Sequence, residues 1–149
     1  MAGVVRLRQG GYELNNHPLD GIWRLIEASS RDAQGRELPP PYGVRPLGMV
    51  QIQNGRMLAA LCNADDLASP DAAREFVSYG GPCQFDGERL VTSVDLSARA
   101  DWLGGEQVRE AELSGERLIL RPPLREYGGV VQRRELVWER VWRPVPAEP

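Results

Sequence analysis

Short apolar segments with alternating polar positions run along most of the chain, and turn-forming residues separate them. The first is 21–30 (GIWRLIEASS), and two more at 47–53 and 56–62 flank Asn54-Gly55. Because both residues of an Asn-Gly pair tolerate positive φ, this pair predicts a two-residue hairpin turn. Similar segments follow at 78–85, 89–97, 117–123 and 133–143. Short alternating segments separated by turn residues in this way are typical of an all-β domain.

The segment DWLGGEQVREAEL (101–113) is ambiguous, because Glu, Gln, Arg and Ala are helix formers. Gly104-Gly105 would destabilise the start of a helix by up to about 1 kcal/mol each relative to Ala. Ser114-Gly115 would then end it after only eight residues. We therefore predict a strand over 105–114. Alternation places four of its residues on the inward face: Gln107, Arg109, Ala111 and Leu113.

The same alternation assigns residues of the neighbouring segments to inward faces. These faces are mainly apolar but include polar side chains. The groups are Leu90, Thr92, Val94 and Leu96; Leu118 and Leu120; and Leu136, Trp138, Arg140 and Trp142.

The segment after Cys62 differs in composition from the others and predicts a short helix. Ser69 is a candidate cap, Pro70 suits the first helical position, and Phe76 and Val77 would share one face. Together with about eight strands joined by short loops, this predicts an up-and-down antiparallel barrel with one short helix capping an end. Closure removes unpaired edges and leaves space for one small ligand.

Composition narrows the class of protein. The 149 residues are 42% apolar and 26% charged, which predicts one domain that buries roughly 70% of its unfolded surface. We expect an N-terminal arm or extra strand over 1–17, the barrel over 18–143 and a tail over 144–149. The 18 basic and 21 acidic residues form no long runs, which argues against a nucleic-acid partner.

The chain shows no signal peptide and no apolar run long enough to span a membrane, so we expect a cytoplasmic protein without a membrane partner, either a monomer or a homodimer. Cys62 and Cys83 are then expected to be reduced. His17 is the single histidine, and no paired Cys/His spacing occurs, so we predict no metal and no cofactor.

Several motifs resemble the small bacterial and fungal lipocalin-like domain family. They are Gly21-x-Trp23, Pro41-Tyr42-Gly43, Trp102-x-Gly104 through Arg109, and Trp138-x-Arg140, in this order within residues 18–143. The resemblance implies a calycin-type barrel that holds a hydrophobic small molecule, without implying a reaction. Where we expect a histidine on the strand before DWLGG, this chain has Thr92. Any chemistry that depends on that imidazole would be absent.

Candidate ligand-binding residues follow from the inward faces and the loops. Arg109 would need an anionic partner, either a bound carboxylate or an internal acid such as Asp95. Tyr79 is assigned to the cavity, whereas Tyr42 and Tyr127 would either contact a ligand or pack in loops. The remaining candidates are Met57, Phe76, Thr92 and Trp138, for which core packing is the alternative.

Trp23 and Arg140 are assigned a structural role, because an arginine on the last strand of a lipocalin can lie across the tryptophan that closes one end of the barrel. Such a cation–π contact contributes about 0.5–2 kcal/mol.

Two main functions remain open. The first is binding of a hydrophobic or aromatic compound with its acid group on Arg109. The second is a cofactor-independent isomerase, cyclase or hydratase in the same cavity, with Tyr79 or Asp95 as acid or base. The facing of Asp95, Glu106 and Glu135 would decide whether acids enter the cavity. A structural or interaction module is a third possibility and would require a filled barrel.

Overall fold

The structure, a computed structural model, describes residues 17–64 and 76–145 and is built almost entirely of strands. The elements are β1 (Gly21–Asp32), β2 (Glu37–Leu38), β3 (Pro46–Gln53), β4 (Arg56–Asn63), β5 (Phe76–Phe85), β6 (Arg89–Ser93), β7 (Leu96–Ser97), the 3-10 turn η2 (Ala100–Trp102), β8 (Glu106–Ser114), β9 (Arg117–Arg121), β10 (Arg125–Tyr127) and β11 (Val130–Trp142).

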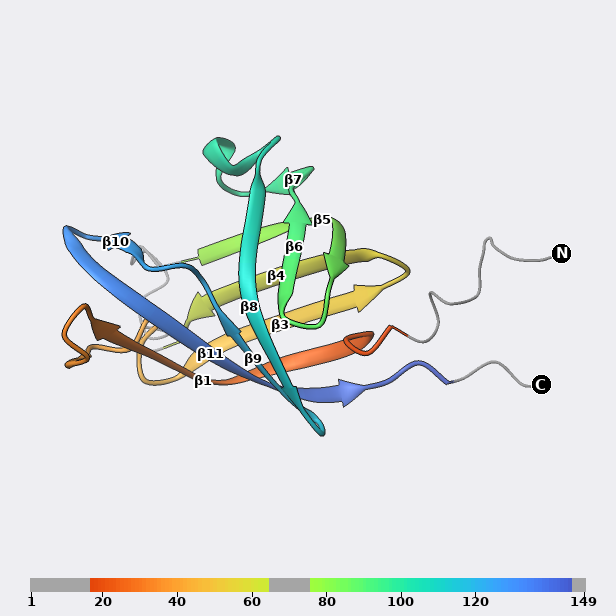
Figure 1. The fold of residues 1–149 in the computed structure, drawn as a ribbon, viewed down its shortest axis with the longest axis horizontal. Coiled ribbons are helices and arrows are strands. Elements are labelled where there is room, and N and C mark those ends of the chain that lie inside the picture. The colour runs from red at the N-terminus through yellow and green to blue at the C-terminus, as the bar shows by residue number, and fades with distance from the viewer. Residues whose placement is uncertain (1–16, 65–75, 146–149) are drawn as a thin grey trace, which may run out of the picture.

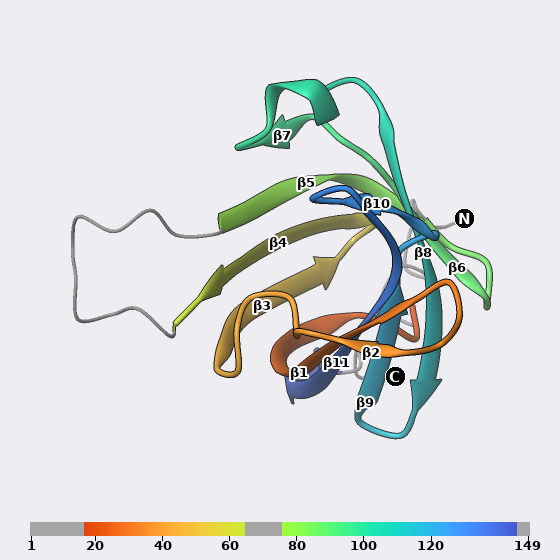
Figure 2. The ribbon, with the colours of Figure 1, turned by 90° about the vertical axis from the view of Figure 1, so that its left-hand side faces the viewer.

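Eight of the strands form a closed antiparallel barrel (Figures 1 and 2). The order β1-β3-β4-β5-β6-β8-β9-β11 follows the chain, and β11 pairs with β1 to close the ring. This seam runs from the pair Ile22–Trp142 to the pair Asp32–Gln132. The predicted all-β, up-and-down barrel is therefore confirmed. The short strands β2, β10 and β7 pair with β1, β11 and β5, respectively.

The two local predictions that matter most for the register are also confirmed. Asn54 and Gly55 have φ of 54° and 76° and join β3 to β4 as a tight hairpin. The ambiguous segment is strand β8, which pairs with β6 on one side and β9 on the other. Strand pairing on both sides thus overrides the helix propensity of its residues. Gln107, Arg109 and Ala111 are buried and point inward, as alternation predicts.

Two sequence predictions need correction. Phe76 and Val77 lie in β5 rather than in a helix, while the rest of the predicted helix lies outside the described residues, as do most of the predicted N-terminal arm and the end of the tail. The predicted strand 89–97 is two strands, because the chain leaves β8 after Ser93 and then pairs with β5. Leu96 consequently points outward with 58% of its surface exposed.

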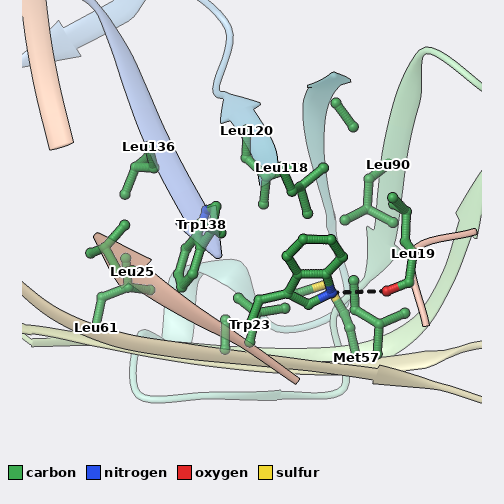
Figure 3. Packing of buried hydrophobic residues seen from close by; sticks show 14 of the residues in the cluster. Leu19, Trp23, Leu25, Met57, Leu61, Leu90, Leu118, Leu120, Leu136 and Trp138 are labelled. Atoms are coloured by element: carbon green, nitrogen blue, oxygen red, sulfur yellow. Dashed lines mark hydrogen bonds between the residues drawn. The ribbon is translucent and has the colours of Figure 1, made fainter. Parts of the chain in front are cut away.

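The buried apolar residues form one cluster inside the barrel, and Figure 3 shows its part around Trp23, near the start of β1. Trp23 is fully buried there, and its indole nitrogen donates a hydrogen bond of 2.9 Å to the backbone oxygen of Leu19. Met57 and Leu90 pack around it. This packing fills the barrel around Trp23, and an internal cavity reaches the other end, where β10 lies.

Candidate functional site

A cavity of about 120 Å³ lies inside the barrel and reaches the residues of β10. A cavity of about 150 Å³ in another protein core takes up benzene, so this volume suits a single ring. Its walls are largely apolar and aromatic, formed by Val50, Ala59, Leu61, Val77, Leu120, Pro122 and Leu136 together with Tyr42, Tyr79, Trp102, Tyr127 and Trp138.

Four arginines line the cavity, whereas none of the acidic residues described in the structure does. Arg109 comes from β8, Arg134 from β11 and Arg125 from β10, and Arg99 precedes η2. Arg99 is paired with Asp101 at 2.9 Å near the surface. A cavity with walls of one charge sign favours a ligand of the opposite sign. The site therefore suits an anion.

Arg109 is the most deeply buried of the charged side chains in the wall, with 9% of its surface exposed. Its guanidinium donates to the backbone oxygen of Val108 at 2.9 Å and to Oε1 of Gln107 at 3.1 Å. Within residues 17–64 and 76–145 no carboxylate pairs with it. A buried charge held only by neutral groups lacks the compensation that an anion would supply.

The predicted alternative for Arg109, an ion pair with Asp95, is wrong. Asp95 lies on the outer side of the barrel, where both of its carboxylate oxygens accept hydrogen bonds from Arg56 at 2.9 and 3.0 Å. Asp95 follows the buried, inward-facing Val94, so alternation along the chain turns its side chain outward. Glu135 accepts a hydrogen bond of 2.7 Å from Arg121 on the outer face of the barrel. Glu106 is exposed. None of these three acids lines the cavity.

Aromatic rings and cations alternate along one wall. The Arg109 guanidinium lies 5.7 Å from the centre of the Tyr79 ring, and Tyr79 meets Trp102 edge-to-face at 5.4 Å. Arg99 lies 5.1 Å from the centre of the Trp102 ring. Cation–π and edge-to-face contacts fix the ring planes, so this wall is preorganised. On the opposite side, Arg134 lies 3.6 Å from the centre of the Tyr127 ring.

Tyr42 reaches the cavity from a strained turn. Its φ is 63°, a left-handed conformation that costs an L-residue about 1–2 kcal/mol, and Gly43 follows with φ of 76°. The side chain is nevertheless buried and lines the cavity. This placement is compatible with both alternatives for Tyr42, ligand contact and packing in the loop.

Other predicted binding residues lie elsewhere. Met57 and Thr92 are buried in the core, where the Thr92 hydroxyl donates to the Met57 sulfur at 2.7 Å, and neither lines the cavity. Phe76 is 55% exposed, because inward alternation of Val77 and Tyr79 turns it to the outer face. The structure brings together Arg109, Tyr79, Tyr42 and Trp138 from the predicted set.

Sequence reasoning missed the other three arginines and Trp102. Arg134 had a readable signal, since it precedes Leu136 by two residues and so shares the inward face of Trp138. The 3-10 turn η2 contains Trp102 and follows Arg99, and the three-residue strand β10 begins at Arg125. No periodicity of the sequence indicates their direction.

At the closed end, Arg140 holds the chain before β1. Its guanidinium lies 4.3 Å from the centre of the Trp23 ring and donates to the backbone oxygens of Asp20 at 2.6 Å and Pro18 at 3.2 Å. The predicted contact between Trp23 and Arg140 is present. Burial raises the pKa of the Asp20 carboxyl to about 6, although the positive charge of Arg140 opposes this shift.

The two cysteines are free thiols. Burial, and next the negative charge of Asp20, raise the pKa of Cys83 to about 11, while Arg56 opposes the shift. A thiol with this pKa has little thiolate near neutral pH and is a poor nucleophile. Neither cysteine lines the cavity.

In the two described ranges, no three His, Cys, Asp or Glu side chains are grouped so that they could hold a metal ion. None of the helical turns seen in the described chain has the length and apolar character to cross a membrane.

The arrangement defines a closed antiparallel barrel with a small internal cavity. The sequence profile of the lipocalin-like domain matches residues 20–141, and the chain belongs to this family. The fold is one that suits ligand binding in general. No curated protein matches the chain.

Two solved structures are similar to the chain. A lipocalin-like protein from Bacteroides uniformis ATCC 8492 has 17% identity and a TM-score of 0.45, with 82% of this chain and 97% of that chain covered. An uncharacterized protein from Bacteroides eggerthii DSM 20697 has 15% identity and a TM-score of 0.43, with 81% and 98% covered.

Proposed function

We propose that the protein binds a small aromatic carboxylate inside the barrel. The ring lies between the apolar walls, and the acid group accepts hydrogen bonds from Arg109. The observation that carries this proposal is the burial of the Arg109 guanidinium without a carboxylate partner in the described chain, in a cavity whose four charged wall residues are all arginines. A bound carboxylate supplies the missing charge and accepts from the planar guanidinium in the geometry that this group favours.

Isothermal titration with benzoate tests the proposal. Benzyl alcohol is the neutral comparison, because it keeps the ring and removes the charge. We expect benzoate to bind wild-type protein more tightly than benzyl alcohol. Arg109→Met should weaken benzoate by about 10- to 100-fold, which corresponds to loss of a charged hydrogen bond worth roughly 1.5–3 kcal/mol. The same variant should change the affinity for benzyl alcohol far less.

Arg24→Met is the matched control, since Arg24 forms an exposed ion pair with Glu139 on the outer surface. It removes the same charge without touching the cavity, so benzoate affinity should stay as in wild type. Equal benzoate affinity in wild-type protein and Arg109→Met would contradict the proposal.

The enzymatic alternative receives less support. Of its two candidate acid–base groups, Asp95 lies outside the cavity and Tyr79 lies in its wall. General acid–base catalysis needs a group within hydrogen-bond reach of the reacting atom. Of the predicted pair, only Tyr79 lies in the cavity wall.

A further inference from the structure

Trp138 carries a buried hydrogen-bond donor that nothing in the described part of the chain accepts. The residue is 2% exposed and lines the cavity, and its Nε1 has no hydrogen-bond partner. The other buried indole differs, since Nε1 of Trp23 donates to Leu19. Most buried polar groups are satisfied, so an orphaned donor in a cavity wall requires an explanation. A ligand acceptor provides one.

The register places this donor deeper than Arg134 of the same strand. β10 pairs with β11 at residues 130–132, so Arg134 lies near the β10 end of β11, two residues before Leu136. Arg109 lies on β8, two residues before Ala111, which pairs with Leu120 of β9.

Trp138 lies two residues beyond Leu136, one step toward the closed end, where it pairs with Leu118. Four residues of strand, about 13 Å, separate the backbone positions of Arg134 and Trp138. Leu120 and Leu136 form an apolar band between the cationic level and the indole. The cavity therefore has a cationic end, an apolar middle and the neutral indole donor of Trp138 at depth.

We infer that the ligand is a one-ring aromatic acid that carries a second hydrogen-bond acceptor on the side of the ring away from the carboxylate. This inference rests on the proposed function. The carboxylate lies at the arginine level, the ring crosses the apolar band, and the second oxygen accepts the Nε1 hydrogen of Trp138. The volume of about 120 Å³ restricts the ligand to one ring.

The test compares 4-hydroxybenzoate with 4-methylbenzoate by isothermal titration. The two acids have nearly the same shape, but only the hydroxyl can accept a hydrogen bond. Wild-type protein should prefer 4-hydroxybenzoate by roughly 3- to 10-fold, the range of one neutral hydrogen bond. In Trp138→Phe the preference should vanish or reverse, because the ring remains and the donor is lost. 2-Hydroxybenzoate, with its hydroxyl beside the acid, should gain nothing from Trp138.

A second measurement keeps the inference testable if Trp138→Phe does not fold. In ¹⁵N-labelled wild-type protein, the indole N–H resonance of Trp138, assigned from contacts with neighbouring residues of β11, should move downfield with 4-hydroxybenzoate and not with 4-methylbenzoate. If both acids bind, with 4-methylbenzoate equal or tighter and this resonance unmoved, the inference is overturned while the proposed function stands. If no benzoate binds, the proposed function itself fails.

Discussion

The guanidinium carbon of Arg140 lies 4.3 Å from the centre of the Trp23 ring, and this contact joins the last strand of the barrel to the first. Arg140 also donates to the backbone oxygens of Pro18 and Asp20, so one side chain fixes both the indole and the segment that covers it.

Arg140→Ala should therefore lower the free energy of unfolding by about 2–4 kcal/mol, since it removes a cation–π contact and two hydrogen bonds from a charged donor. Urea denaturation measures the loss. Arg24→Ala is the matched control on the same seam, because Arg24 pairs with Glu139 at 2.8 Å on the exposed face. An exposed pair contributes about 0–1 kcal/mol. Similar losses in the two variants would show that Arg140 does not brace the barrel.

Arg109→Met should leave the ligand-free protein as stable as wild type or raise its free energy of unfolding by up to about 2 kcal/mol. The substitution removes a buried charge that has no carboxylate partner in the described chain and keeps most of the apolar volume. Thermal and urea unfolding without ligand provide the measurement. A loss above about 2 kcal/mol would identify Arg109 as a structural brace rather than a binding residue.

Gly81 is a position where any side chain would disrupt the barrel. A Cβ atom there would lie 1.9 Å from the backbone oxygen of Ser93, so the link between β6 and β7 would have to move. Gly81→Ala should destabilise the protein by about 3 kcal/mol or more, or abolish folding. At Gly105 the nearest atom to a Cβ is 3.6 Å away, so Gly105→Ala is the control and should cost less than about 1 kcal/mol. Equal effects would refute the close approach.

Asp20 predicts a pH dependence of stability. Its pKa is raised from 3.8 to about 6 by burial, so between about pH 4 and 6 the native state keeps a proton that the unfolded state has released. The free energy of unfolding should therefore fall as pH rises through this window, by roughly 1–2 kcal/mol, and stay level above it.

Urea titrations of wild type and Asp20→Asn from pH 4 to 7 isolate this contribution. Both proteins should also carry His17→Gln, because burial lowers the pKa of His17, which acts in the opposite sense, and its Nδ1 lies 3.6 Å from Oδ1 of Asp20. Asp32, Asp86 and Asp101 have lowered pKa values, so their contribution is lost below about pH 4. The free energy of unfolding of wild type, relative to that of Asp20→Asn, should therefore rise as the pH is lowered from 7 to 4. A pH-independent difference would contradict the raised pKa.

The strands of the barrel are predictable from the sequence where apolar and polar residues alternate over many positions, so that the two faces of the strand differ in polarity. β8 shows this well, since two glycines and strand periodicity outweigh its helix-forming residues, and alternation alone predicts the inward position of Arg109. The prediction failed where the chain bends. Alternation predicts Leu96 on the inward face, because nothing local indicates that the chain switches partners after Ser93.

The glycines of the YGG segment illustrate the same limit. The predicted strand 78–85 contains them, but nothing in the sequence indicates that Gly81 of β5 lets another backbone approach closely. Close approach between segments distant in sequence is a property of the packed barrel. Likewise, the cationic cavity end combines Arg99, Arg109, Arg125 and Arg134 from four separate elements.

The pairing of β1 with β11 ties the earliest described strand to the latest. Such a seam is a contact of high sequence separation, and contacts of this kind slow folding. During synthesis, β1 therefore has one open edge until residue 142 has left the ribosome, and a nascent chain without β11 carries an exposed apolar wall. We expect slow folding and transient chaperone binding as consequences of this connectivity.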